Sequence, residues 1–71
     1  MCNYEVLEAI REQMEKLILH ACDLRNRFHD VEEEFRIGNL DRSTLSSLNQ
    51  AVHKIETDAG AFEKLLKGSA R

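Results

Sequence analysis

The chain has 71 residues, of which 42% are hydrophobic and 32% charged, and its formal net charge is −3. This length allows one small domain with a modest core, and the composition is that of a globular or coiled-coil chain, which excludes intrinsic disorder. No two Lys or Arg residues are adjacent. Because nucleic-acid binding needs clustered basic side chains that neutralise phosphates, this pattern argues against a general nucleic-acid binder.

The N-terminal half of the chain predicts one long helix. Its apolar residues recur in alternating steps of three and four, as residues on one face of a helix do. This first seam consists of Leu7, Ile10, Met14, Leu17, Ala21, Leu24, Phe28, Val31 and Phe35. Such a sustained repeat is typical of coiled-coil packing, and the chain contains no proline that would interrupt it. We therefore expect a helix at about residues 4–37.

A helix stop and a second seam follow. Gly38 and Asn39 are typical residues for the end of a helix, and either Asp41 or Ser43 can cap the next one. The second seam keeps the same spacing and consists of Leu45, Leu48, Val52, Ile55, Ala59, Phe62 and Leu66. We expect a turn at about residues 38–42 and a helix at about residues 43–67, ended by Gly68.

The short connection predicts a single all-α domain over residues 1–71, a coiled-coil-like antiparallel hairpin. Folding at the turn brings the two seams together in register. The expected layers are Phe35/Leu45, Val31/Leu48, Phe28/Val52, Leu24/Ile55, Ala21/Ala59, Leu17/Phe62 and Met14/Leu66. Polar residues beside the seams agree with this register, because Arg25 falls opposite Glu56 and His20 opposite Asp58.

Apolar residues that a lone pair of helices cannot cover gather at the end away from the turn. The predicted partner-binding residues are Val6, Leu7, Ile10, Ile18, Cys22 and Leu65. An apolar patch on so small a domain favours an interface, although single apolar residues on a surface are ordinary. The partner is either another protein or a second copy, and in the second case two hairpins would form a four-helix bundle.

Residues that carry chemistry are sparse. None of the three histidines belongs to a Glu-x-x-His or His-x-x-x-His pair, and His29 with Glu33 would supply only two ligands. The acidic run over residues 30–34 is typical of a solvated helix face. Cys2 and Cys22 would lie roughly 30 Å apart on one helix, too far for a disulfide. We expect no metal, no cofactor and no enzymatic activity.

The sequence also predicts a cytoplasmic protein. Its start, Met-Cys-Asn-Tyr-Glu, lacks the basic and apolar regions of a signal peptide. The longest apolar run of aliphatic residues, over residues 17–19, is far too short to span a bilayer, so no membrane partner is expected.

The turn and the second helix carry a resemblance. Residues 36–38, Arg-Ile-Gly, are followed by a polar turn and then by residues 48–56, Leu-Asn-Gln-Ala-Val-His-Lys-Ile-Glu. This arrangement resembles the small co-chaperones that guard the needle subunit of bacterial type III secretion systems, which have an Arg-Gly turn before a Gln-rich second helix with a leucine-glutamate step. Here that step is Ile55-Glu56, and an Asp-Arg-Ser-Thr turn replaces the proline or glutamine-tyrosine element of the family. The resemblance implies a cytoplasmic protein that joins a helical-repeat co-chaperone and keeps an aggregation-prone needle subunit soluble.

Two alternatives remain open on the sequence. A homodimeric four-helix bundle could bind paired RNA loops if Arg11, Lys16, Arg25 and Arg27 formed a basic face. A small regulator could instead inhibit a larger protein by docking a helix against it. RNA binding would depend on salt, whereas a specific protein complex would resist nuclease.

Overall fold

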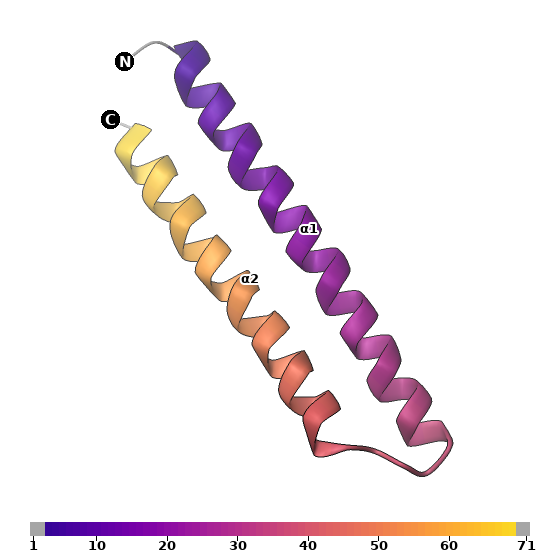
Figure 1. The fold of residues 1–71 in the computed structure, drawn as a ribbon. Helices are drawn as coiled ribbons and strands as arrows, with labels where there is room; N and C mark the ends of the chain where they lie inside the picture. Colours follow the sequence, from indigo (N-terminus) through magenta and orange to yellow (C-terminus); the bar gives the residue numbers. More distant parts are fainter. Residues whose placement is uncertain (1–2, 70–71) are drawn as a thin grey trace.

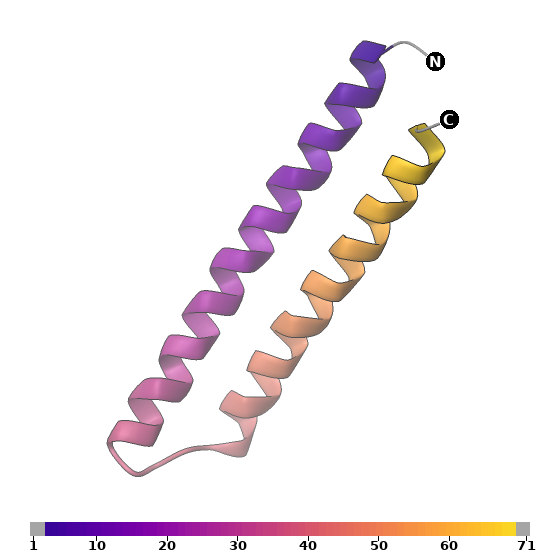
Figure 2. The same cartoon turned by 180° about the vertical axis from the view of Figure 1, so that it is seen from behind.

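The computed structural model describes residues 3–69 as two helices joined by a short turn (Figure 1). Helix α1 spans Asn3–Arg36 and helix α2 spans Arg42–Ser69. The helices run antiparallel and side by side, and α1 continues past the end of α2 at the end away from the turn (Figures 1 and 2). The Cα atoms extend over 54 × 15 × 13 Å, which makes the molecule a rod. The expected all-α antiparallel hairpin is confirmed.

Helix α1 ends in a glycine-dependent cap. Gly38 has a φ of +74°, a left-handed conformation that glycine adopts without a steric penalty. The N–H of Asn39 donates to the carbonyl of Glu34 at 2.8 Å, and the N–H of Gly38 donates to that of Phe35 at 3.1 Å. This pair of bonds is the Schellman motif, which satisfies carbonyls that the last turn of a helix leaves free.

Helix α2 begins at a capping aspartate. The N–H of Ser43 donates to Asp41 Oδ1 at 3.3 Å, and the Ser43 hydroxyl donates to Asp41 Oδ2 at 2.9 Å. These two bonds hold the pKa of the Asp41 carboxyl below its ordinary value. Of the two caps that the sequence allowed, Asp41 is therefore the one that starts the helix.

Glu34 fastens the turn to α1. Its Oε1 accepts a hydrogen bond from the N–H of Asp41 at 2.9 Å, and its Oε2 accepts one from the Thr44 hydroxyl at 2.6 Å. The sequence had placed Glu34 on a solvated acidic face, and for this residue that prediction is wrong. Glu34 is half-buried because its position on α1 points it toward α2, whereas Glu32 and Glu33 are exposed.

The two helices meet along a row of half-buried apolar residues, here called the central stripe. These residues recur at every seventh position, as core residues of coiled coils do. They are Ile10, Leu17, Leu24 and Val31 on α1 and Leu48, Ile55 and Phe62 on α2. The central stripe comprises four of the nine residues of the first predicted seam and three of the seven of the second.

A polar seam lies beside the central stripe on one side of the hairpin. It consists of Gln13, His20 and Glu34 on α1 and of Thr44, Ala51 and Asp58 on α2, all buried or half-buried. Ala51 is 2% exposed and Asp58 is 4% exposed, the lowest values among the described residues. The small side chain of Ala51 lets the two helices approach closely on this side.

The remaining residues of each predicted seam are exposed, which corrects the expected layers. The exposed residues, here called the outer stripe, are Leu7, Met14, Ala21, Phe28 and Phe35 on α1 and Leu45, Val52, Ala59 and Leu66 on α2. Four predicted layers, those of Phe35/Leu45, Phe28/Val52, Ala21/Ala59 and Met14/Leu66, are therefore only partly covered within the hairpin. Both helices are rotated so that the bonded side chains of the polar seam, and not the outer stripe, lie between them.

The predicted register is nevertheless retained. His20 Nδ1 donates to Asp58 Oδ2 at 2.5 Å, which fixes the two helices at this level. Leu24 lies about one helical turn from His20 toward the hairpin turn, and Ile55 lies about one turn from Asp58 in the same direction. The layer of Leu24 and Ile55 is thus level, as the sequence predicted.

Candidate protein-binding surface

The outer stripes of both helices lie on the same side of the hairpin. On each helix, an outer-stripe residue follows a central-stripe residue by four positions, as Met14 follows Ile10 and Val52 follows Leu48. Residues four apart are neighbours on a helix surface. Two antiparallel helices are related by an approximate two-fold axis perpendicular to the plane that contains them. This axis maps one helix onto the other without changing the side of the plane. Because the outer stripe is four positions from the central stripe on both helices, the two outer stripes lie on the same side of the hairpin. The central and outer stripes together form one apolar surface, here called the open face.

The open face contains large side chains that are accessible to solvent. Phe28 is 50% exposed and Phe35 is 74% exposed, and both lie in the half of α1 nearer the turn. Leu7 is 51% exposed at the other end of the same stripe. The apolar surface therefore runs the length of the rod, and is not confined to the end away from the turn.

The accessible surface of the whole chain agrees with this view. It measures 5797 Å², whereas a compact monomer of 8.2 kDa is expected to expose roughly 4,500 Å². The excess of about 1,300 Å² is larger than the roughly 800 Å² that each partner buries in a standard protein interface. The hairpin thus exposes more surface than a compact monomer of its mass, as an elongated pair of helices does.

Charged residues border the open face. The rim residues follow the outer stripe by four positions and are all exposed: Arg11, Ile18, Arg25 and Glu32 on α1 and Asn49, Glu56 and Glu63 on α2. His53 Nδ1 lies 2.9 Å from Glu56 Oε1 on the same helix. Arg25 makes no ion pair with another described residue. The sequence placed Arg25 opposite Glu56. In the structure Arg25 lies on the rim of α1 and Glu56 on the rim of α2, so the two residues lie on opposite edges of the open face.

The six predicted partner-binding residues lie in different environments. Leu7 and Ile10 belong to the open face, and Ile18 lies on its rim with 55% of its surface exposed. Val6 and Leu65 are half-buried and continue the line of the polar seam at the end away from the turn. The contribution of these residues to binding stays a prediction.

Cys22 lies farther from α2 than the rim. It follows Ile18 by four positions, and its thiol is free and exposed. Cys2, the other cysteine, lies outside the described residues.

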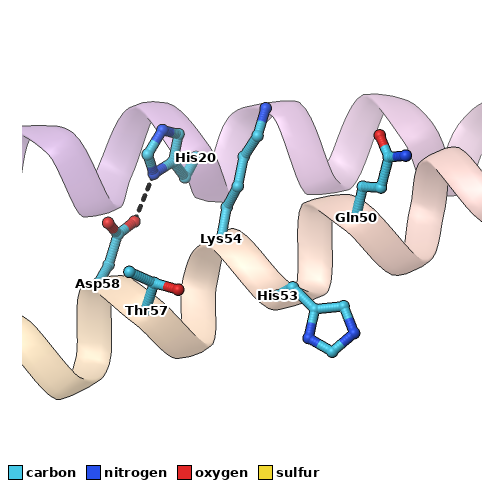
Figure 3. Close-up of a pocket in the computed structure, with 6 residues that line it drawn as sticks. All are labelled: His20, Gln50, His53, Lys54, Thr57 and Asp58. Atoms are coloured by element: carbon cyan, nitrogen blue, oxygen red, sulfur yellow. Dashed lines mark hydrogen bonds and ion pairs between the residues drawn. The ribbon is translucent and has the colours of Figure 1, made fainter.

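The side of the hairpin opposite the open face carries a shallow depression of about 290 Å³. Figure 3 shows its six lining residues, and the His20 ring from α1 points at the Asp58 carboxylate from α2. The Lys54 side chain extends across α1, while the His53 ring points away from it (Figure 3). Because the buried carboxylate of Asp58 is bonded to His20, this pair acts as a polar cross-link between the helices.

A second depression, of about 430 Å³, lies near the end of α1 and is lined only by residues of that helix. His29 Nδ1 lies 3.1 Å from Glu32 Oε1, and Arg36 is paired with Glu33. These are local pairs three residues apart on an exposed helix, and they contribute little to stability.

Neither metal-binding clusters nor membrane spans were found in the described part of the chain. Among residues 3–69, no group of three or more His, Cys, Asp or Glu side chains is placed to hold a metal ion. Neither α1 nor α2 contains a stretch long and apolar enough to cross a bilayer.

The fold and the open face define a class of molecule: a small helical hairpin that is amphipathic as a whole. Comparison with known proteins does not assign the chain to a family, because no protein-family model, no curated protein and no solved structure matches it. The function is therefore inferred from the surface itself.

Proposed function

We propose that the chain is a protein-binding module that packs its open face against helices of another polypeptide chain. The observation that carries this proposal is the continuous apolar surface formed by the central and outer stripes, with Phe28 and Phe35 exposed to solvent. A soluble monomer rarely exposes so extended an apolar patch unless the patch is used for binding.

The shape of the open face favours a helical partner. The open face consists of two outer stripes on either side of half-buried residues such as Leu24 and Ile55. An amphipathic helix can pack its apolar face against such a pair of helices, with anchors spaced three and four residues apart. The charged rim, with Arg25 on one edge and Glu56 on the other, would then set the direction of the bound helix.

The resemblance to type III secretion co-chaperones supplies one specific form of this proposal. An aggregation-prone needle subunit would be kept soluble if its apolar surface were covered, and the open face is an apolar surface that could cover it. The test is to co-express a needle subunit with this chain and to measure the soluble fraction of the subunit. We expect the wild-type chain to raise that fraction and the Phe28→Ser variant to lose the effect.

The alternative of RNA binding is less well supported by the charges. Arg11 pairs with Glu8 at 3.4 Å, and Arg27 pairs with Asp23 at 3.5 Å, so two of the four candidate basic residues are already matched with carboxylates. The net charge of −3 makes the approach of an RNA phosphate backbone unfavourable.

A double substitution on the open face tests the general proposal. Phe28→Ser with Val52→Ser removes apolar surface from both helices, and Leu19→Ser is the matched control because Leu19 is 70% exposed and lies off the open face. Association is measured by sedimentation, exposed apolar surface by the fluorescence of a hydrophobic dye, and helicity by circular dichroism. We expect the wild-type chain either to associate or to bind the dye.

The double variant should lose whichever of these two properties the wild-type chain shows, while the control keeps it and helicity is unchanged. A double variant that associates and binds dye as the wild-type chain does would contradict a binding role for the open face.

A further inference from the structure

We propose that the open face binds a second copy of this chain, so that two hairpins form a four-helix bundle with both turns at the same end. In this arrangement α1 of each copy lies antiparallel to α2 of the other. The inference rests on the proposed function and names the occupant of the open face.

The exposed area is of the size that a stable dimer needs. The chain exposes about 1,300 Å² more than a compact monomer of its mass. A standard interface buries roughly 800 Å² on each partner, and obligate homodimers bury 2,000 Å² or more in total, so the chain has enough surplus surface for such a contact. Interfaces of that class resemble a domain core cut in half, which is how the central and outer stripes are arranged here.

The packing between copies would repeat the register of the hairpin. If the two-fold axis that relates the two copies is parallel to the rod, each residue has the same position along the rod in both copies. Every outer-stripe residue of α1 except Leu7, which has no layer partner, then meets its predicted layer partner from the other copy. Four layers that are open in the single chain would be closed: Phe35/Leu45, Phe28/Val52, Ala21/Ala59 and Met14/Leu66. All seven predicted layers are then paired, three within each hairpin and four between the copies.

The small residues of the outer stripe lie where the two copies need to approach most closely. Ala21 and Ala59 are level with each other near the middle of the rod, and larger side chains such as Met14 and Phe28 lie to either side of Ala21 along α1. Two hairpins can come together at this small layer while their larger side chains interlock around it.

The charges of the rim select the orientation of the second copy. With both turns at one end, Arg25 of one copy lies beside Glu56 of the other, about 3 Å apart in height along the rod. The symmetric contact repeats the pair, so two opposite-charge pairs form per dimer. Arg25 has no ion-pair partner within the described hairpin, so it is available for this contact.

The opposite orientation has less favourable charges. With the turns at opposite ends, α2 of one copy would lie against α2 of the other. The rim of α2 carries Glu56 and Glu63, so acidic side chains would approach acidic side chains. Like charges across an interface disfavour that arrangement.

A charge exchange in the full-length chain tests the arrangement. The dimer dissociation constant is measured by sedimentation equilibrium at low salt for Arg25→Glu, for Glu56→Arg and for the variant with both changes. We expect a mass of twice 8.2 kDa for the wild-type chain. Each single change should weaken the dimer about fivefold to tenfold, and the double change should restore wild-type affinity.

Lys16→Glu is the matched control. Lys16 is exposed on the side of the polar seam and makes no ion pair with another described residue, so its reversal alters the net charge as Arg25→Glu does. We expect its dissociation constant to change less than twofold. All of these residues are exposed, so the variants should fold as the wild-type chain does, which circular dichroism verifies.

The remaining outcomes separate this inference from the proposed function. A dimer that tolerates both single changes, or that the double change does not restore, overturns the same-end arrangement. A monomer at all concentrations that binds a hydrophobic dye overturns the second copy as occupant and leaves the open face for a different protein. A monomer that binds no dye overturns the proposed function as well.

Discussion

The two helices pack differently on the two sides of the hairpin, that of the polar seam and that of the open face. On one side, the polar seam is closed: Asp58 is 4% exposed and bonded to His20, and Ala51 brings the helices together. On the other side, the open face holds most of the large apolar side chains and leaves its outer stripe to solvent. A few directional contacts thus favour one rotation of the helices, while the apolar residues supply surface for a further contact.

This division of roles has a physical reason. A hydrogen bond between two side chains forms only within a narrow range of distances and angles, so a bonded pair such as His20 and Asp58 restricts the rotation of the helices. Burial of apolar area is non-directional, and it is gained equally well within one chain or between chains. An apolar stripe too wide for one partner helix can therefore be shared between two contacts.

The largest effect is expected in the central stripe, which both sides of the hairpin share. Ile55→Ala removes a half-buried side chain between the helices and should cost on the order of 2 to 4 kcal/mol of unfolding free energy, measured by urea titration. Leu19→Ala, on the exposed back of α1, should change it by less than about 0.5 kcal/mol. Equal costs for the two variants would show that the central stripe is not where the helices are held together.

A somewhat smaller effect is expected in the polar seam. His20→Ala leaves the buried Asp58 carboxylate without its hydrogen-bond partner and should cost about 1 to 3 kcal/mol. Replacing both residues by leucine removes the buried charge together with its partner and should restore stability to the wild-type value or above it. If His20→Ala has the stability of the wild-type chain, the bond between His20 and Asp58 has no part in joining the helices.

Replacing a glycine by alanine should have opposite effects on the free energy of unfolding in the turn and in the helix. Gly38→Ala places a side chain at a φ of +74° and should cost about 1 kcal/mol. Gly60→Ala should stabilise by about 0.5 to 1 kcal/mol, because Gly60 lies within α2 and a Cβ there meets no atom within 4 Å. Thermal melts of the two variants should therefore shift in opposite directions. A loss of stability for Gly60→Ala would mean that this position is covered in the assembled protein.

The smallest effect is expected at the cap of α2 and depends on pH. Hydrogen bonds from Ser43 hold the pKa of Asp41 below its ordinary value, so the folded state favours the charged carboxylate. Its contribution to stability is present above the ordinary pKa of an aspartate, about 4, and is lost as the pH falls through the lowered value. Asp41→Ala should lower the melting temperature near neutral pH, and the difference from the wild-type chain should shrink in acid. A constant difference would exclude the charge of Asp41 as its cause.

The elements and the register of the fold follow from local patterns, whereas the rotation of the helices does not. Alternating steps of three and four mark one face of a helix, but they leave open which half of the face meets a single partner helix. The decisive signal lay in polar residues that share the seven-residue repeat, namely His20 and Glu34 on one helix and Thr44 and Asp58 on the other. Whether these polar residues lie between the helices depends on hydrogen bonds between segments far apart in the sequence, which no local pattern specifies.

The candidate surface was predicted in part for the same reason. Leu7 and Ile10 were selected because α2 ends before reaching them, an argument from length alone. Phe28 and Phe35 were assigned to the interior of the hairpin because their spacing suits a core, and the rotation of the helices instead exposes them. The role of Glu34 could not be foreseen, since it depends on the conformation of the turn after it.

The turn also gives the molecule a direction. Because one tight connection joins the helices, the start of α1 and the end of α2 lie at the same end of the rod (Figure 1). A domain fused to either terminus would therefore be held at one pole, with the turn standing at the other, along a Cα length of 54 Å. In a four-helix bundle with both turns at one end, the four helix termini would lie together at the other end. Domains fused to the two copies would therefore be held next to each other.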